Sequence, residues 1–367
     1  MVAATSVNYF DRQVLSVLAP VLRERFAWTN TDYSILIFAF LLGWALGEVP
    51  LGMLIDRIGA RRGYLAVVTA WSAAILAHAF ARTLPHFALL RLLLGFCECG
   101  NWSAGMKAIA QWFPAEERAK AAGIFNGAIN LGAILAPPVT IWLTLRYGWQ
   151  APFVFAAVLG FLWLLPWARL YRATWEPVAR DRVRSHQIPA GGIRHLLRTA
   201  ECRGLIAARF LIGPVWSLYV FWLPEYLKRE RHMSLDLIGL LSWIPFAISV
   251  AGSVVGGAFS DRLVARRYSP IKARRIALTV AALLSSTGIG VAIAPGVVGS
   301  FVLICVAAFG LSFWAANFYA LISDVYPAEQ VGRVTALTGV GNGVGGCCTC
   351  WPPGWWWTAG LTCRCSP

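Results

Sequence analysis

Long apolar runs recur along the whole chain and are separated by short polar segments. Each run approaches the ~20 residues that a helix needs to cross the ~30 Å hydrocarbon layer of a bilayer. Ten such runs lie at residues 2–22, 34–55, 63–81, 87–113, 121–145, 151–168, 204–224, 237–260, 276–294 and 297–323. A shorter apolar stretch at residues 334–346 begins an eleventh. The pattern predicts an all-α membrane protein with about ten complete transmembrane helices and a partial eleventh.

Composition and charge support this prediction. Hydrophobic residues make up 58% of the chain and charged residues only 13%, whereas soluble domains carry about 25% charged residues. The net charge of +15 first suggests a nucleic-acid partner, but the Lys and Arg residues are unevenly distributed between the loops: 20 on one side and 7 on the other. By the positive-inside rule, this asymmetry predicts a cytoplasmic N-terminus in the inner membrane, basic loops facing anionic lipid, and no nucleic-acid partner.

The chain divides into two similar halves. We expect a six-helix bundle at residues 1–170, a basic cytoplasmic linker at 171–203 and an incomplete second bundle at 204–346. The segment around Asp56 recurs around Asp261 at the same place in the second half. Duplicated halves are typical of transporters, because two bundles can rock about a site held between them. A channel or receptor built on such a repeat is the less common alternative.

The last 21 residues, 347–367, differ from everything before them. They contain five Cys and four Trp, and they interrupt the eleventh helix. We expect this aberrant tail to be an out-of-frame read of a longer gene. Zinc binding by its cysteines is the alternative, but we expect no metal site, no cofactor and no enzyme activity, because no phosphate loop, His-rich motif or nucleophile elbow is present.

Ionisable residues inside the apolar runs are costly and therefore point to function. They are Asp11, Arg12, Glu48, Arg91, Glu98, Lys107 and Arg209. Arg91 and Glu98 are seven residues apart, so they share one helix face about 10 Å apart along the axis.

Two of these charges are cations suited to a carboxylate. Arg12 and Arg91 can each offer paired donors, whereas Asp11 and Glu98 are carboxyls suited to proton coupling. The alternative is a set of permanent salt bridges between the first and fourth helices.

Three other charges are less clear. Lys107 either reaches the inner interface or lines the lower cavity, and Arg209 is expected at an interface. Glu48 either pairs with a basic residue or adds a second titrating site.

Several motifs resemble one known family. The run from Gly52 to Arg62 resembles the cytoplasmic signature of the major facilitator superfamily. Asn8–Arg12, Arg91–Glu98 and Trp222–Leu227 resemble the anion:cation symporter family within it, above all the hexuronate and sugar-acid (aldonate) transporters. The resemblance implies that Asp11 and Glu98 take up protons and that Arg12 and Arg91 serve the anion or the coupling network. Which Arg contacts the carboxylate stays open.

The resemblance also implies gating residues at the inner face. Asp56 and Arg57 would close this face in the outward-open state, with Arg118 as a partner of Asp56. Asp261 and Arg262 are the copies in the second half. A simple positively charged loop is the alternative.

Aromatic and amide side chains complete the expected substrate wall. The resemblance places Tyr9 and Trp44 against the sugar, and an aromatic face with a polar edge suits a polyol. Asn126 and Asn130 are four residues apart, so they share a helix face. Trp314 and Asn317 are the comparable candidates in the second half. Helix packing is the alternative role for each of them.

These observations together favour a monomeric secondary transporter that takes up a small organic anion, a hexuronate or related sugar acid, with protons. A ligand-binding membrane sensor without transport is one alternative. A non-functional truncated product is another. The sequence does not distinguish among galacturonate, glucuronate, galactonate and glucarate.

Overall fold

All regular elements in the described residues are helices. The computed structural model describes residues 1–112, 115–171, 192–291, 293–294, 296–326 and 328–348. The helices of the first half are α1 (Val2–Phe26), α2 (Asn30–His78), α3 (Leu84–Glu98), α4 (Gly100–Trp112), α5 (Ala115–Tyr147) and α6 (Ala151–Leu170). Those of the second half are α8 (Gly192–Arg198), α9 (Ala200–Arg229), α10 (Leu235–Leu241), α11 (Ile244–Ala265), α12 (Pro270–Ser286), the 3-10 turn η1 (Thr287–Val291), α13 (Gly296–Val325) and α14 (Ala328–Cys348).

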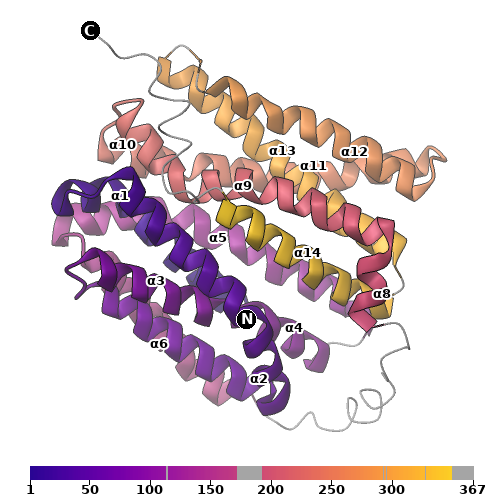
Figure 1. Ribbon diagram of the computed structural model, residues 1–367, viewed down its shortest axis with the longest axis horizontal. Coiled ribbons are helices and arrows are strands. Elements are labelled where there is room, and N and C mark those ends of the chain that lie inside the picture. The colour runs from indigo at the N-terminus through magenta and orange to yellow at the C-terminus, as the bar shows by residue number, and fades with distance from the viewer. Residues whose placement is uncertain (113–114, 172–191, 292, 295, 327, 349–367) are drawn as a thin grey trace.

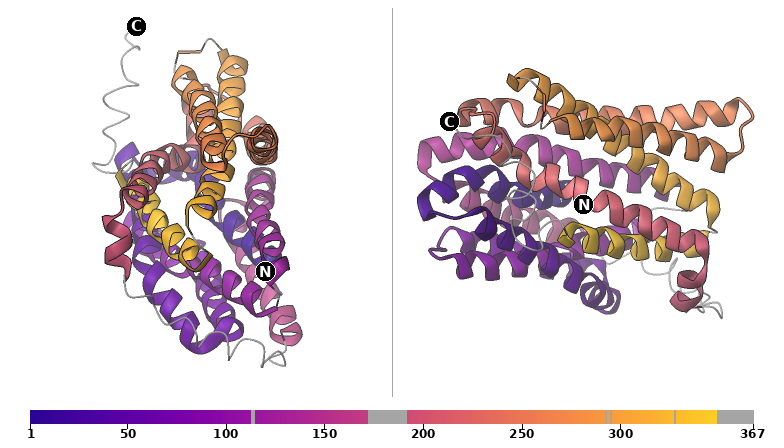
Figure 2. Two further views of the ribbon diagram at one scale, coloured as in Figure 1. Left: turned by 90° about the vertical axis from the view of Figure 1, so that its right-hand side faces the viewer. Right: turned by 45° about the horizontal axis from the view of Figure 1, so that its top comes forward.

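The two halves lie side by side. The indigo-to-magenta helices α1 to α6 form one group, and the salmon-to-yellow helices α8 to α14 form the other (Figures 1 and 2). The halves meet where α1 packs on α9, α5 packs on α10 and α11, and α2 packs on α14.

Helix boundaries follow the apolar runs, with local breaks. α2 covers two of the runs, and its backbone leaves the helical conformation at Gly59, where φ is 86° and ψ is 160°. Glycine adopts this positive φ without the steric cost that a side chain would add. α2 begins with a capping box, in which Thr29 accepts from the Asp32 backbone and Asp32 accepts from the Thr29 backbone. The run at residues 87–113 is divided at Cys99 into α3 and α4.

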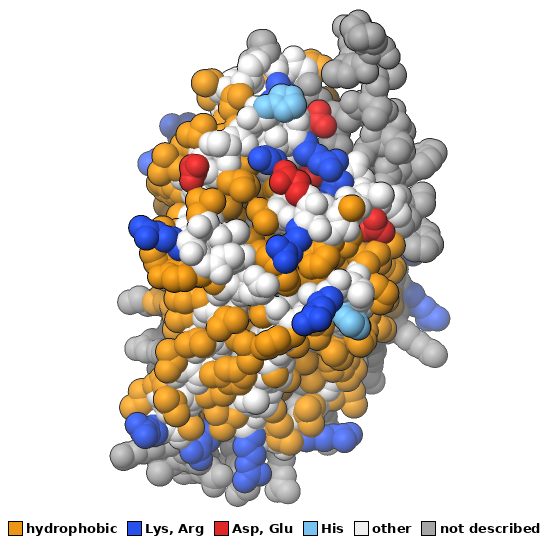
Figure 3. Space-filling view, turned by 90° about the vertical axis from the view of Figure 1, so that its left-hand side faces the viewer, with side chains coloured by type: hydrophobic (Ala, Val, Ile, Leu, Met, Phe, Trp, Pro, Cys, Tyr) orange, Lys and Arg blue, Asp and Glu red, His pale blue; other side chains and the backbone are white. Residues whose placement is uncertain are grey.

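Six segments of the described chain are long and apolar enough to cross a membrane. They are Asn30–Glu48, Gly127–Tyr147, Ala151–Leu170, Ala200–Arg229, Leu235–Ala265 and Gly296–Val325. Hydrophobic side chains cover a broad band of the face in Figure 3, with Lys and Arg along its lower edge and charges of both signs in its upper part. The predicted all-α fold is therefore confirmed, whereas the count of ten crossings stays a prediction.

Two predicted segments fall largely on residues that are not described. Residues 172–191 of the expected linker and residues 349–367 of the expected tail lie outside the described residues. α14 continues through Cys348. The boundaries predicted for the linker and the tail stay predictions.

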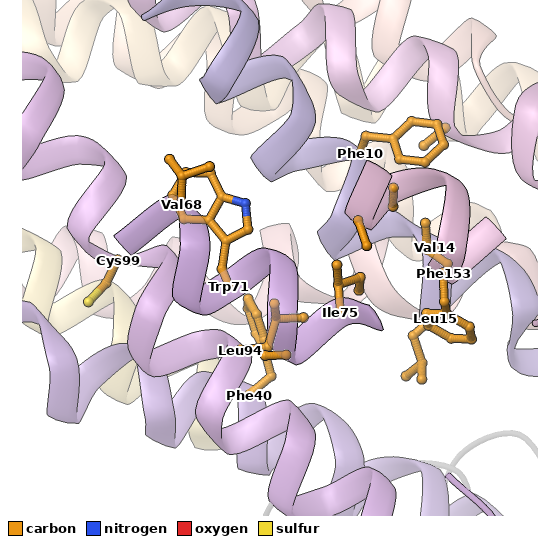
Figure 4. Close-up of a cluster of buried hydrophobic side chains, with 14 of the residues drawn as sticks. Phe10, Val14, Leu15, Phe40, Val68, Trp71, Ile75, Leu94, Cys99 and Phe153 are labelled. Carbon is orange, nitrogen blue, oxygen red and sulfur yellow. The ribbon is translucent and has the colours of Figure 1, made fainter. Parts of the chain in front are cut away.

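A buried apolar cluster joins four helices of the first half. Phe10 of α1, Phe40 and Trp71 of α2, Leu94 of α3 and Phe153 of α6 belong to it, and each is at most 4% exposed. Figure 4 shows Phe40, Trp71 and Leu94 converging between α2 and α3. Burying such large side chains positions the helices that carry the charged residues described below.

Glycines let α2 and α3 approach unusually closely. A Cβ on Gly43 would lie 2.1 Å from the Leu92 carbonyl oxygen, and a Cβ on Gly95 would lie 2.1 Å from the Phe40 carbonyl oxygen. Small residues allow backbones to meet in this way in membrane bundles. This contact places one face of α2 against the charged face of α3.

Gly95→Ala tests that contact. The added methyl group must displace the α2 backbone, so we expect a loss of about 1–3 kcal/mol of stability and a lower apparent Tm in detergent. Gly127→Ala is the matched control, because Gly127 is exposed on α5 and a methyl group added there would meet no atom within 4 Å. Equal Tm values for the two variants would show that the close approach is not needed.

Candidate functional site

Four ionisable side chains lie buried in the first half. Asp11 and Arg12 come from α1, and Arg91 and Glu98 come from α3. Arg12 is 8% exposed and the other three are 0% exposed. The Arg12 Nη2 atom donates to the Glu98 Oε2 atom at 3.3 Å. The predicted α1–α3 charge set therefore includes one direct ion pair inside the bundle.

Aromatic rings surround the Arg12 guanidinium. Its Cζ atom lies 4.4 Å from the ring centroid of Tyr9, 4.4 Å from that of Trp44 and 5.3 Å from that of Phe40. A guanidinium is attracted to the face of an aromatic ring by the ring quadrupole. Tyr9 and Trp44 are only half-buried, so they form a partly accessible wall beside the ion pair.

Arg91 lacks a hydrogen-bonding partner of its own within the described chain. Its Nε, Nη1 and Nη2 atoms are buried without a hydrogen bond to any described residue, and its Cζ atom lies 5.0 Å from the Phe40 ring centroid. Both carboxyl oxygens of Asp11 and the Oε1 atom of Glu98 share this condition. Buried charged groups without partners are costly. These atoms therefore offer unused donors and acceptors inside the bundle.

Sequence reasoning missed several neighbours of the cluster. The Phe40 ring contacts the guanidinium groups of both Arg12 and Arg91, and its spacing of four residues from Trp44 was a signal that both rings share one face of α2. Asn8 donates to the Glu98 carbonyl oxygen at 3.5 Å. Thr5 and Asn101 bond to each other across α1 and α4, with an N–O distance of 3.0 Å. These polar contacts hold α1 in place beside Glu98.

The predicted amide pair on α5 is described in part. Asn130 is half-buried. Gly132 follows it by two residues on α5, and a Cβ added to Gly132 would lie 3.0 Å from the Cβ of Tyr9. α5 therefore packs against α1 next to the aromatic wall. The side chain of Asn126 lies outside the described residues.

Trp314 and Asn317 occupy a different environment. Asn317 donates to the Gly256 carbonyl at 2.9 Å and to the Phe313 carbonyl at 3.0 Å, which ties α13 to α11. Trp314 stacks on Phe318 with ring centroids 4.5 Å apart. Trp314 belongs to the apolar core of the second half, and Asn317 is fully buried beside it, with its Oδ1 atom unpaired among the described residues. Their role in substrate binding stays a prediction.

The predicted inner gate is described mainly in the second half. Arg274 of α12 contacts Asp261 of α11 at 3.1 Å and Asp324 of α13 at 3.1 Å, and it also bonds to Ser260. Sequence reasoning missed Arg274 and Asp324, because only the fold brings three helix ends together. Arg262, the residue after Asp261 in the sequence, is exposed.

Its counterpart in the first half is only partly described. Arg57 is exposed, whereas the side chains of Asp56 and Arg118 lie outside the described residues. Their predicted pairing stays a prediction.

The three remaining charges each have a distinct setting. Lys107 donates to the Ile55 carbonyl at 3.0 Å, so it links α4 to α2. Arg209 donates to the Tyr319 hydroxyl at 2.8 Å, within the second half. Glu48 is half-buried on α2 and faces α14, where a Cβ on Gly339 would lie 3.4 Å from its Oε1 atom.

The described residues contain no group of three or more His, Cys, Asp or Glu side chains that could hold a metal ion. The candidate site consists of two guanidinium groups, two carboxyls and the aromatic rings around Arg12. Such a site can bind an anion and exchange protons.

Comparisons with known proteins show which family the chain matches and which transporters it is similar to. Residues 1–348 match the family described as Major Facilitator Superfamily. The hexuronate transporter of Escherichia coli (strain K12) is 26% identical over 358 residues, covering 92% of this chain and 81% of that protein. The probable galactarate/D-glucarate transporter of the same strain is 30% identical over 358 residues, covering 89% and 80%.

Solved structures show the same fold. A bacterial homologue of the human lysosomal transporter Spinster, in an inward-facing conformation, gives a TM-score of 0.79 at 17% identity and covers 95% of this chain and 79% of that chain. The D-xylose–proton symporter gives a TM-score of 0.67 at 18% identity, covering 95% and 88%.

A double-mutant cycle tests whether Arg12 and Glu98 interact. Arg12→Met leaves Glu98 buried without its cation, and we expect it to cost about 3 kcal/mol in stability, seen as a lower apparent Tm in detergent. Adding Glu98→Gln removes the unpaired charge, so the double variant should recover much of the loss. Additive losses would mean that the two side chains do not interact.

Proposed function

The chain belongs to the Major Facilitator Superfamily, and from this premise we propose that it takes up a sugar acid of the hexuronate class together with protons. In this proposal a single chain in the inner membrane, with its N-terminus in the cytoplasm, alternates between states open to each side. The relatives named above supply the substrate class, since one is a hexuronate transporter and the other a probable galactarate/D-glucarate transporter.

The observation that carries the proposal is the buried set of two cations and two carboxyls. Arg12 and Arg91 provide donors for a carboxylate, and the Arg91 nitrogens have no hydrogen-bond partner among the described residues. A guanidinium binds a carboxylate through two parallel N–H donors. Arg91 is therefore well suited to hold the substrate carboxylate, with Arg12 as the second cation of the site.

Charge balance explains why protons accompany the anion. With all four groups ionised, Asp11, Arg12, Arg91 and Glu98 sum to zero. An anionic substrate adds one negative charge in a setting where an uncompensated charge is costly. Protonation of Asp11 or Glu98 restores neutrality, so anion and proton enter the buried site together.

The Arg12–Glu98 pair provides a mechanical link between the two events. When Glu98 binds a proton, its attraction for Arg12 falls, and the guanidinium becomes available to the anion. When the proton leaves, the pair re-forms at the expense of the bound carboxylate. Proton release and substrate release are then coupled through one side chain.

The surrounding side chains suit a hydroxylated ligand. Tyr9 and Trp44 are half-buried beside Arg12, and aromatic faces with a polar edge pack well against sugar rings. Asn130 lies on the neighbouring helix α5 and its amide can bond to hydroxyl groups. Asn126, one turn earlier on α5, is assigned to the same wall.

Closure at the cytoplasmic end is assigned to the two related motifs. Asp56, Arg57 and Arg118 would close the first half, and Asp261 and Arg262 the second. The contacts from Arg274 to Asp261 and Asp324 support this assignment, because they tie the ends of α11, α12 and α13 into one unit that can move as a body.

An uptake assay tests the proposal directly. In membrane vesicles that contain the protein, we expect labelled glucuronate or galacturonate to accumulate when the outside is acidic. One pH unit contributes about 1.4 kcal/mol per proton, or up to about tenfold accumulation. Vesicles without the protein are the control. Binding without uptake would favour a sensor, and neither binding nor uptake would favour a non-functional product.

Glu98→Gln tests the coupling role. The amide keeps the size of the side chain but cannot exchange a proton, so we expect accumulation driven by a pH gradient to be lost while substrate exchange across the membrane is kept. Glu201→Gln is the matched control, because Glu201 is exposed at the start of α9. Unaltered proton-driven accumulation in Glu98→Gln would contradict the proposed role.

A further inference from the structure

A second buried ion pair joins the two halves of the molecule. The Nη1 atom of Arg23, in the last turn of α1, lies 2.6 Å from the Oε1 atom of Glu225 on α9. Their side chains are 2% and 1% exposed. The two residues are 202 positions apart in the chain, so the pair exists only while the halves are in contact at this end.

Neighbouring polar groups make this pair a small network. Arg23 also donates to the Asn30 side-chain oxygen at 2.6 Å and to the Trp28 carbonyl at 3.3 Å. The half-exposed Arg229 contacts the same Glu225 oxygen at 2.8 Å. Glu225 thus accepts from one cation of each half. We name Arg23, Asn30, Glu225 and Arg229 the α1–α9 latch.

A seam of direct hydrogen bonds leads from the latch towards the charged site. Ser16 donates to the Val220 carbonyl at 2.8 Å and to the Phe221 carbonyl at 3.1 Å. Tyr33 of α2 donates to the same Phe221 carbonyl at 2.6 Å. Pro224 has no backbone N–H, so the carbonyl of Val220, four residues earlier, lacks its usual helical donor. The Ser16 hydroxyl donates to this carbonyl.

The latch and the site lie on one face of α1. Arg12 and Arg23 are eleven residues apart, which is close to three full turns and about 16 Å along the helix. Ser16 follows Arg12 by four residues and faces the same way. Arg12, Ser16 and Arg23 therefore lie along one face of α1, so one helix carries both the charged site and the contact with α9.

We propose that the α1–α9 latch closes the extracellular end of the protein and that its opening exposes the charged site to that side. The inference rests on the proposed alternating access, in which the halves must separate at one end at a time. A buried pair favours the closed state only while both partners are present. When one partner is removed, the other charge stays buried without compensation in the closed state, and opening lowers that cost because water then reaches it. Arg23 and Glu225 therefore set the balance between the two states without touching the substrate.

The test measures access to the seam rather than transport. Ser16→Cys places a thiol between the latch and the site, at a position that is 0% exposed. The purified full chain in lipid nanodiscs is treated with a water-soluble maleimide and the labelling rate is recorded. Each latch variant is measured with and without Ser16→Cys, because the second sample gives the background from the nine native cysteines.

Glu225→Gln and Arg23→Gln are the two informative variants. Each should raise the labelling rate at residue 16 by at least about fivefold, because the population open at this end increases. The double variant should give no larger increase than the stronger single variant, since both changes break one interaction. Glu230→Gln is the matched control, because Glu230 is exposed at the end of the same helix, and it should leave the rate unchanged.

An unchanged rate in both single variants would overturn the latch, whatever the uptake assay shows. A raised rate in a protein that fails to take up any sugar acid would leave the latch standing and contradict the proposed function instead. If Glu225→Gln aggregates, Arg229→Gln takes its place: it removes only the half-exposed cation and should raise the rate by a smaller factor, and no increase there counts against the latch.

Discussion

Opposite charges buried among apolar helices are the constraint on which this structure depends. A charge in such an interior is costly without a partner. The pair of Arg12 and Glu98 joins α1 to α3, and the pair of Arg23 and Glu225 joins α1 to α9. The first pair lies within one half and the second joins the two halves. The positions of α1 relative to its neighbours are therefore set as much by these pairs as by apolar packing.

Close backbone packing brings α2 against the helix that carries Arg91 and Glu98. Gly43 and Gly95 let α2 and α3 approach within a distance that no Cβ would permit, and the Phe40 ring of α2 contacts the guanidinium groups of both Arg12 and Arg91. A cation is attracted to the face of an aromatic ring, so the Phe40 ring stabilises both guanidinium groups.

Buried charged residues are unevenly distributed between the two halves. The buried charge cluster lies entirely in α1 and α3, whereas the described part of the second half contributes Glu225 to the seam and the Arg274 network to the opposite end. Asn317 connects α13 to α11 within the second half.

Local patterns in the sequence were enough to predict the helices, the family resemblance and the four charged residues of the site. Apolar length and the cost of an intramembrane charge are properties of short segments, so Asp11, Arg12, Arg91 and Glu98 stood out without any knowledge of their neighbours. The seven-residue spacing of Arg91 and Glu98 also placed both on one face of a single helix.

Only the tertiary structure decided how these groups pair. Glu98 pairs with Arg12, the Phe40 ring contacts both Arg12 and Arg91, and Arg23 pairs with a carboxylate 202 residues away. The Asn317 amide nitrogen donates to the backbone of α11. Such outcomes depend on the rotation of each helix about its axis and on how closely two helices approach. Those quantities arise from packing among segments distant in the chain, and no single segment encodes them.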